Sequence, residues 1–493
     1  MKPLLLHLLL ATTASAALRA GAAKADITDY KAGPANDPAF VKVLALDDGK
    51  TRSLLITVDA VSLGEIGFID NGYLTRIRTA IEKELGVPSK NLMVNASHCH
   101  HVVRKDADAI TIQAAREAWR KLTPVRAGAG RGREDRIMEN RRMTLKDGRE
   151  TDVRRAYSMP RDADVVATGP VDPEIGLLRL DRLDGSPLAV IYNFAAHPIH
   201  GVPSGANTAD YPGFASKAIE ENLGRDVLAF FIQGCAGDIN PAKYKDVHTP
   251  HDAEPLGNQL GLSVLRAARA IATKEVTEFR VRNEMLDLPR AADYAARIAA
   301  MRAKKEKLIA ALAPTSLNFK TFTELYVQYS LAGESPSYYK HRYLHESATG
   351  REELGRMDAD NRVEMNRYLR NIETMEELTR LQTNLALLEQ HQTETAGRTV
   401  LPVEVAGLRI GEFQLVTFPG ELTVEIGLRL KRQFNTGFHF VAGYTNGYIY
   451  YTPTAAQRRN PGYAQEDCDS LVAPEWQAQF EARALQVFAQ LSK

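Results

Sequence analysis

Short apolar runs that alternate with helical patterns limit this 493-residue chain to a small group of folds. Continuous apolar runs bounded by turn residues are typical of the buried strands of α/β proteins. Such runs span residues 54–58, 92–94, 188–192, 227–232, 413–418 and 438–442. Helical periodicity spans residues 73–85, 214–223, 256–271 and 422–434. The alternation predicts an α/β fold, in which a mixed β-sheet core is flanked by helices.

The segment from about residue 289 to residue 392 differs from the rest of the chain. It is rich in Ala, Leu, Glu, Lys and Arg, and long stretches of it have a helical period. We interpret it as a helical insertion, with loops near Pro314 and over residues 333–337. The helices could form an antiparallel pair that only packs on the sheet, or a lid over the functional site. We favour packing.

Residues 1–16 have the pattern of a secretory signal peptide, which would leave residues 17–493 as one domain. Lys2 precedes an apolar stretch over residues 4–10, and Ala14-Ser15-Ala16 fits a cleavage site of small residues. The alternative, a buried N-terminal helix, is disfavoured because the next residues resemble the start of a mature chain. We therefore expect a secreted or periplasmic protein. No later run of about 18 apolar residues exists, so no transmembrane helix is predicted.

Charge and cysteine content exclude several classes of function. The formal net charge of +1 argues against a nucleic-acid partner, because phosphate binding requires a concentrated basic surface. The widely spaced Cys99, Cys235 and Cys468 do not make a disulfide framework, although one bridge could form in an oxidising compartment. No Cys-x-x-Cys pair is present, which excludes a thiolate zinc knuckle. Nothing in the sequence indicates a protein partner.

Histidines follow two of the predicted strands. In open α/β sheets, sites form beyond the carboxyl ends of the strands. His98 and His100 follow the strand at residues 92–94, and residues two apart on an extended chain face the same side, as metal-binding pairs often do. His197 directly follows the strand at residues 188–192. For the first pair, the alternative is a polar loop whose histidines bond to the backbone.

Glycines and acidic residues follow two further strands. In the loop from Gly234 to Asp238, glycines would let backbone N–H groups approach a ligand, and Asp238 could orient a histidine. A plain tight turn is the alternative. Glu421 is expected in a first helical turn, where the helix dipole favours an ionised carboxylate that could bind a metal. An ordinary acidic residue at a helix N-terminus is the alternative.

Tyrosines are dense in residues 443–453, which follow the last predicted strand. Tyrosine can pack, donate a hydrogen bond or, when deprotonated near a cation, bind it. The composition of this stretch by itself indicates packing.

Together these stretches resemble the catalytic domain of the neutral ceramidases and their bacterial relatives. The resemblance is also carried by residues 18–28, Asn140-Arg141-Arg142, residues 170–174, residues 207–213 and Gln233-Gly234-x-x-Gly237-Asp238. It spans most of the chain, apart from residues 1–16 and much of the helical insertion.

The resemblance implies a zinc ion held by His98, His197, Glu421 and Tyr448. It also implies that His100, beside the metal, assists catalysis.

In the same family, Arg141 and Tyr463 would bind or polarise the scissile carbonyl. Asp238 would join the catalytic set, and Gly234, Gly237 and Asn240 would line the substrate site.

The chain departs from the family pattern in three places. Where the family usually has His-Thr-His-Ser-Gly-Pro, residues 98–103 read His-Cys-His-His-Val-Val, which alters the floor of the pocket. Asn240 stands where ceramidases often have a serine with an assigned catalytic role, although a route through zinc and water does not need that hydroxyl. The immunoglobulin-like C-terminal domain of ceramidases is expected to be missing, because the chain ends soon after a helix predicted at residues 474–491.

The leading hypothesis is a secreted, zinc-dependent hydrolase that cleaves an amide (N-acyl) bond with metal-activated water. Its substrate would be ceramide or another small molecule or lipid, and a lipid substrate would allow peripheral contact with a membrane. One alternative is a hydrolase of another exported substrate, such as a glycan or an ester. The other is a non-catalytic binding protein that contains a metal.

Overall fold

The computed structural model describes residues 17–153, 159–224 and 226–493. Two β-sheets packed face to face form the core of the protein. In sheet order, the larger sheet contains β12 (Leu228–Gln233), β11 (Pro187–Phe194), β10 (Glu174–Arg182), β5 (Thr123–Arg133), β1 (Arg19–Asp26), β2 (Phe40–Asp47), β3 (Arg52–Val58) and β4 (Leu92–Ala96). The smaller sheet contains β14 (Phe279–Pro289), β15 (Val400–Ile410), β16 (Phe413–Thr417) and β18 (Phe438–Ala442). The predicted α/β class is confirmed.

Within the described residues, three smaller sheets accompany these two. The first pairs β6 (Met138–Asn140) with β13 (Ile239–Pro241), and the second pairs β17 (Glu421–Leu422) with β19 (Tyr451–Thr452). The third contains β8 (Glu150–Asp152), β7 (Arg142–Leu145) and β9 (Val165–Thr168).

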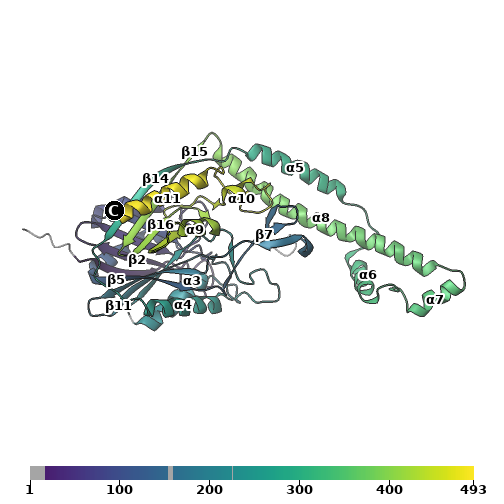
Figure 1. Cartoon of the computed structure of the whole chain (residues 1–493), viewed down its shortest axis with the longest axis horizontal. Helices are drawn as coiled ribbons and strands as arrows, with labels where there is room; N and C mark the ends of the chain where they lie inside the picture. The colour runs from purple at the N-terminus through teal and green to yellow at the C-terminus, as the bar shows by residue number, and fades with distance from the viewer. Residues whose placement is uncertain (1–16, 154–158, 225) are drawn as a thin grey trace, which may run out of the picture.

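Helices cover the outer faces of both sheets. The larger sheet carries α1 (Tyr73–Leu85), α2 (Ala107–Arg120), α3 (Asp210–Leu223) and α4 (Ala253–Arg269), and the smaller one carries α11 (Trp476–Ser492). The short α9 (Val424–Lys431) and α10 (Ala455–Arg459) belong to the C-terminal part of the chain. Figure 1 shows α3 and α4 along the lower side of the larger sheet and α11 beside the strands of the smaller one.

Alternate residues of the central strands explain this layering. In β2, Val41 and Val43 pack in the helix-facing core with Ile77 of α1, whereas Leu44 and Leu46 pack between the two sheets. Successive side chains of a strand point to opposite faces, so a strand buried on both faces is mainly apolar. Such strands are therefore visible in sequence as continuous runs.

All six predicted strands are present, and they pair with one another in parallel. β3 pairs with β4, β11 with β12, and β16 with β18. Other strands, such as β1 and β5, were not predicted because they are rich in Ala, Gly and charged residues. A Cβ at Gly21 of β1 would lie 2.1 Å from the carbonyl oxygen of Ala118 in α2, so this strand needs small residues where the helix packs closely.

The two edges of the larger sheet meet at the carboxyl ends of β12 and β4. The backbone N–H of Gln233 donates to the side-chain oxygen of Asn95 over 2.9 Å, although their strands lie at opposite ends of the sheet order. An isolated bridge joins Asn95 to Thr445, which follows β18. The curling of the sheet therefore brings the carboxyl ends of all three parallel pairs to one place.

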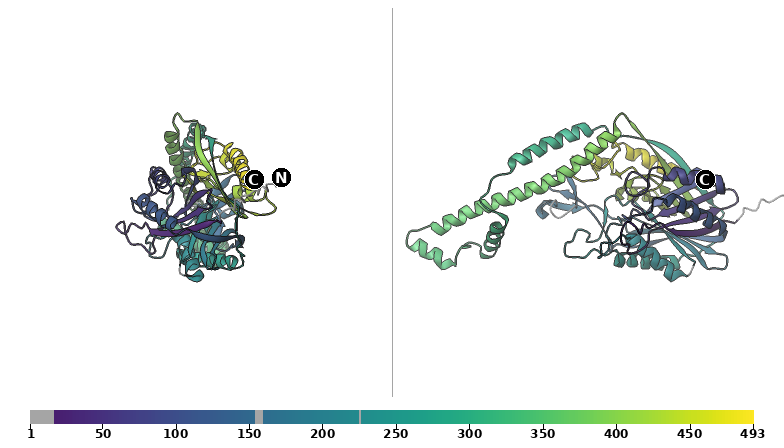
Figure 2. Two further views of the ribbon diagram at one scale, coloured as in Figure 1. Left: turned by 90° about the vertical axis from the view of Figure 1, so that its left-hand side faces the viewer. Right: turned by 180° about the vertical axis from the view of Figure 1, so that it is seen from behind.

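The helical insertion projects from the body as a long arm (Figures 1 and 2). It contains α5 (Tyr294–Ala311), α6 (Phe319–Ala332), α7 (Lys340–Ala348) and α8 (Glu353–Thr395), with breaks at both predicted loops. The 43 residues of α8 correspond to a length of roughly 65 Å. The C-terminal part of α8 packs on the body, whereas its N-terminal part lies in the arm with α6 and α7.

Among the described residues, no helix is both long and apolar enough to cross a membrane. The predicted signal peptide, residues 1–16, lies outside the described residues. Cys99, Cys235 and Cys468 are all buried and free.

Candidate metal centre

Three side chains from distant parts of the chain meet at the carboxyl ends of the parallel strands. His98 follows β4, His197 follows β11, and Glu421 lies on β17. Glu421 Oε2 lies 3.1 Å from His197 Nε2 and 3.6 Å from His98 Nε2, and all three side chains are buried. Their potential ligand atoms lie within 4.8 Å of one another. The structure therefore brings together these three of the side chains that the family resemblance implies for zinc, and the fourth, Tyr448, contacts Glu421 as well.

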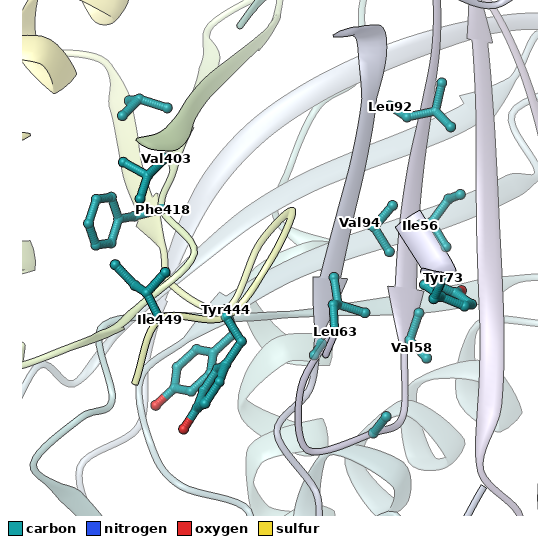
Figure 3. Close-up of a cluster of buried hydrophobic side chains, with 14 of the residues drawn as sticks. Ile56, Val58, Leu63, Tyr73, Leu92, Val94, Val403, Phe418, Tyr444 and Ile449 are labelled. Carbon is teal, nitrogen blue, oxygen red and sulfur yellow. The ribbon is translucent and has the colours of Figure 1, made fainter. Parts of the chain in front are cut away.

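A buried apolar cluster holds these segments beside one another. Figure 3 shows Phe418 and Tyr444, from the segments after β16 and β18, on one side of this cluster. Val58 and Val94, from β3 and β4, lie on the other side. The polar site is thus assembled at the edge of a packed core.

Both histidines are oriented by backbone carbonyl groups. His98 Nδ1 lies 2.6 Å from the oxygen of Val61, and His197 Nδ1 lies 3.0 Å from the oxygen of Ile239. A carbonyl oxygen can only accept, so the ring hydrogen of each neutral imidazole is on Nδ1. Each Nε2 then presents a lone pair toward Glu421.

Burial keeps both imidazoles neutral. It lowers the pKa of His98 to about 4, against the opposing effect of the Glu421 carboxylate. Burial also lowers the pKa of His197, and the positive charge of Arg141 lowers it further. Two neutral nitrogen acceptors therefore face a carboxylate oxygen with no hydrogen between them, an arrangement that a cation would stabilise. Two imidazoles and one carboxylate are a normal protein set for catalytic zinc, so the residues fit that metal.

Glu421 does not lie in a helical turn, and this part of the prediction is wrong. It belongs to β17, which pairs with β19, and α9 begins only at Val424. Its carboxylate accepts hydrogen bonds from the hydroxyls of Tyr448 and Tyr444. Burial raises the pKa of Glu421, yet the net pKa lies below its usual value, and the Tyr448 hydroxyl is among the groups that lower it. Local donors, rather than a helix dipole, favour the ionised form.

Two tyrosines contact this carboxylate. Tyr448, expected as the fourth metal ligand, donates to Glu421 Oε1. Tyr444 donates to Oε2 over 3.1 Å, and its ring centroid lies 4.5 Å from that of His98. The density of tyrosine was visible in the sequence, but nothing in the composition indicated that Tyr444 would face the site.

His100 lies beside the cluster and is exposed to solvent. Its ring is edge-on to that of His98, with 5.6 Å between the ring centroids. This is a suitable position for a group that exchanges protons with water.

Arg141 lies one aromatic ring away from His197. The guanidinium is 5.3 Å from the ring centroid of Tyr451, and that ring stacks on His197 with 6.4 Å between centroids. Arg141 also donates to Glu466 over 2.7 Å and to the carbonyl oxygen of Gly237 over 2.6 Å. Neither Tyr451 nor Glu466 was singled out from the sequence, because each acts only through contacts with distant residues.

Asp238 contacts a helix N-terminus instead of a histidine. Its Oδ1 accepts from the backbone N–H of Val424 over 2.8 Å, and its Oδ2 accepts from the side chain of Asn140 over 3.1 Å. Burial raises the pKa of Asp238 to about 6, although both of these hydrogen bonds oppose the shift. Asp238 therefore anchors the start of α9, directly after the strand that carries Glu421.

The loop glycines are explained by packing. The N–H of Gly234 donates to the oxygen of Phe194 and that of Gly237 to the oxygen of Leu422, both over 2.8 Å, so these groups already have protein partners. Asn240 is buried in β13, and its side-chain oxygen lies 3.4 Å from Arg141.

Tyr463 lies at the base of the arm. Its ring faces Arg149, 4.4 Å from the centroid, and Arg380 of α8, 5.2 Å from the centroid. It lines a cavity of about 390 Å³ together with residues of β7 and α8. Within this segment, Glu466 is the residue that reaches Arg141.

Two solved structures share this architecture. One, described as a ceramidase complexed with C2, matches with a TM-score of 0.59 and 18% identity over 97% of this chain and 75% of that chain. The other, neutral ceramidase from Pseudomonas aeruginosa, matches with a TM-score of 0.58 and 18% identity over the same shares. No protein-family model and no curated protein sequence matches the chain. The chain therefore has the fold of neutral ceramidase.

Proposed function

We propose that this protein is a zinc-dependent hydrolase that cleaves the amide bond of an N-acyl substrate. The observation that carries the proposal is the meeting of His98, His197 and Glu421, with both Nε2 lone pairs facing a carboxylate oxygen. The ceramidase fold supports an amide as the bond that is cut, and N-acyl sphingosine as the first substrate to test.

The surrounding residues would divide the chemistry among them. Zinc, when bound, polarises a carbonyl oxygen and makes a water molecule more acidic. Arg141, one aromatic ring away from His197, would supply positive charge for the oxygen that becomes negative as the carbonyl is attacked. The solvent-exposed His100 would move a proton to the leaving amine.

Asn240 supports water, rather than a protein hydroxyl, as the attacking group. The side chain at this position has no nucleophilic oxygen, and it is buried and in contact with Arg141. An acyl–enzyme route through this position would therefore not operate.

The proposal is tested by metal analysis combined with turnover. Purified protein is expected to contain zinc and to hydrolyse N-acyl sphingosine, to lose activity with a chelator and to regain it with added zinc. Glu421→Gln removes the negative charge of the centre and should lower zinc affinity and activity by at least about 100-fold. Glu134→Gln is the matched control, because Glu134 is also buried but contacts Arg136 and Ser263.

A panel of other amides, esters and glycosides distinguishes the remaining outcomes. Turnover of an ester or glycoside alone would assign another hydrolase activity. Zinc binding without turnover of any substrate would favour a non-catalytic binding protein. A wild-type protein that binds no zinc would contradict the proposal.

We also propose that the protein is exported, on the basis of the signal-peptide pattern in residues 1–16. Fractionation of expressing cells should find a mature chain that begins near residue 17 outside the cytoplasm. A full-length chain retained in the cytoplasm would contradict this.

A further inference from the structure

One buried glutamine side chain contacts both histidine-bearing segments. Gln233, at the end of β12, has no exposed surface. Its Nε2 donates to the oxygen of Ala196 over 2.8 Å and to the oxygen of Ser97 over 3.2 Å. These carbonyl groups belong to the residues directly before His197 and His98.

We propose that Gln233 is a positioning residue that sets the separation of His98 and His197 in the metal centre. This inference rests on the proposed zinc-binding function and assigns to Gln233 the geometry that such binding requires. Outer partners of metal ligands commonly control affinity in this way, because they decide where the ligands lie before the metal arrives.

The chemistry of the amide group suits this role. A primary amide has two N–H donors in one plane, and here each is used by a different segment. The side-chain oxygen of Gln233 accepts from the backbone N–H of Gly234 over 3.1 Å, which fixes the orientation of the amide. One rigid group therefore sets the distance between two carbonyls that are far apart in the chain.

Asn95 extends this connection to the third segment of the site. Its Oδ1 accepts from the backbone N–H of Gln233, and its Nδ2 donates to the oxygen of Gly443 and to the hydroxyl of Thr445, each over 2.9 Å. Tyr444, between those two residues, donates to the Glu421 carboxylate. Gln233 and Asn95 thus connect the backbone before both histidines to the segment of Tyr444, whose hydroxyl donates to Glu421.

The backbone of His98 gives a reason why such a restraint is needed. His98 has a φ of 71°, a conformation that costs free energy for a residue other than glycine and persists only when its surroundings enforce it. Its N–H donates to the oxygen of Ala60 on one side. The preceding carbonyl, that of Ser97, is held by Gln233 on the other.

The test compares zinc affinity in three variants. Gln233→Met keeps the volume and removes both donors, and Gln233→Glu keeps the shape. Asn384→Leu is the matched control, because Asn384 is a buried amide on α8 that donates to the oxygen of Gly462. We expect both Gln233 variants to bind zinc about 10- to 100-fold more weakly than wild type, and Asn384→Leu to bind it as wild type does.

The cobalt(II)-substituted proteins give a second readout, because their absorption spectra report ligand geometry independently of turnover. The Gln233 variants should have altered spectra, and the control should not. Zinc affinity within threefold of wild type and an unchanged cobalt spectrum in either folded Gln233 variant would overturn the inference.

A wild-type protein that binds no zinc would defeat the proposed function but would still leave the positioning role open to test. Crystal structures of wild type and Gln233→Met then decide whether Gln233 positions the two histidine loops. Displaced His98 and His197 loops would support the role, and superimposable loops would refute it. Should Gln233→Met fail to fold, the same comparison is made with Gln233→Glu.

Discussion

Asp210 is a carboxylic acid held where an ion is unfavourable. It is buried, and its oxygens accept from the backbone N–H groups of Gly201 and Tyr211. Burial raises the pKa of Asp210 from 3.8 to about 7, in spite of those two donors, and the charge of Asp37 adds to the shift. In the unfolded chain the same carboxyl should titrate near its ordinary value.

Asp210→Asn is expected to reduce the pH dependence of stability. Between about pH 4 and pH 7 the folded protein retains a proton that the unfolded chain has lost, so the free energy of unfolding falls as pH rises. Asparagine has no such proton and tolerates the positive φ of this position, 56°. The decrease over this range should be smaller in the variant by on the order of 1–4 kcal/mol. Urea unfolding at several pH values measures the free energy of unfolding of both proteins. If this free energy changed with pH equally in wild type and Asp210→Asn, another group would be responsible.

At the scale of elements, the short strand β17 depends on the close approach of a glycine. A Cβ placed on Gly237 would lie 2.6 Å from the carbonyl oxygen of Glu421 and 3.0 Å from that of Leu422. Both of these are backbone atoms, so relief would require β17 to move.

Gly237→Ala should therefore destabilise the protein by about 1–3 kcal/mol and also weaken zinc binding, since Glu421 would be displaced. Gly355→Ala is the control, because Gly355 lies in α8, is exposed and has no neighbour within 4 Å of the added Cβ. That change should raise stability by up to about 1 kcal/mol, since alanine favours a helix. Chemical unfolding measures the stability of each variant, and zinc titration measures its zinc affinity. Unchanged zinc affinity in Gly237→Ala would contradict the expected displacement of Glu421 on β17.

At the scale of the whole molecule, the arm has two parts with different roles. Its outer part has a small core of its own, which contains Phe322, Tyr329 and Met365. Its inner part attaches the arm to the body. Arg380 of α8 donates to both the side chain and the backbone of Asp152, and His391 bonds to Asp469 over 2.7 Å.

Replacing residues 315–368 by a short Gly-Ser linker should leave zinc content and the melting temperature of the body nearly unchanged. The linker can be short because Ala313 and Asn371 are joined by two reciprocal hydrogen bonds, of 3.1 and 2.8 Å. Arg380→Met, by contrast, removes a buried guanidinium that donates to both the side chain and the backbone of Asp152, and should cost about 3–5 kcal/mol. Loss of turnover in a truncated protein that still binds zinc would instead show that the outer arm acts on substrate.

Much of the architecture could be predicted from local patterns. A strand buried on both faces is mainly apolar, so the six apolar runs identified six strands and, with them, the places where polar side chains could gather. His98 and His197 were found because each stands within five residues of the end of such a run.

What the sequence by itself determined is therefore the strands and the residue types at their ends. Only the tertiary structure decided that β12 would meet β4 through Gln233 and Asn95, and that Glu421 would lie on a strand. It also decided that Tyr444 would bond to that carboxylate and that Glu466 would hold Arg141. The physical reason is that a hydrophobic pattern is a property of neighbouring residues, whereas each of these contacts joins residues that lie far apart in the chain or on separate elements. Those contacts exist only once the curled sheet has closed.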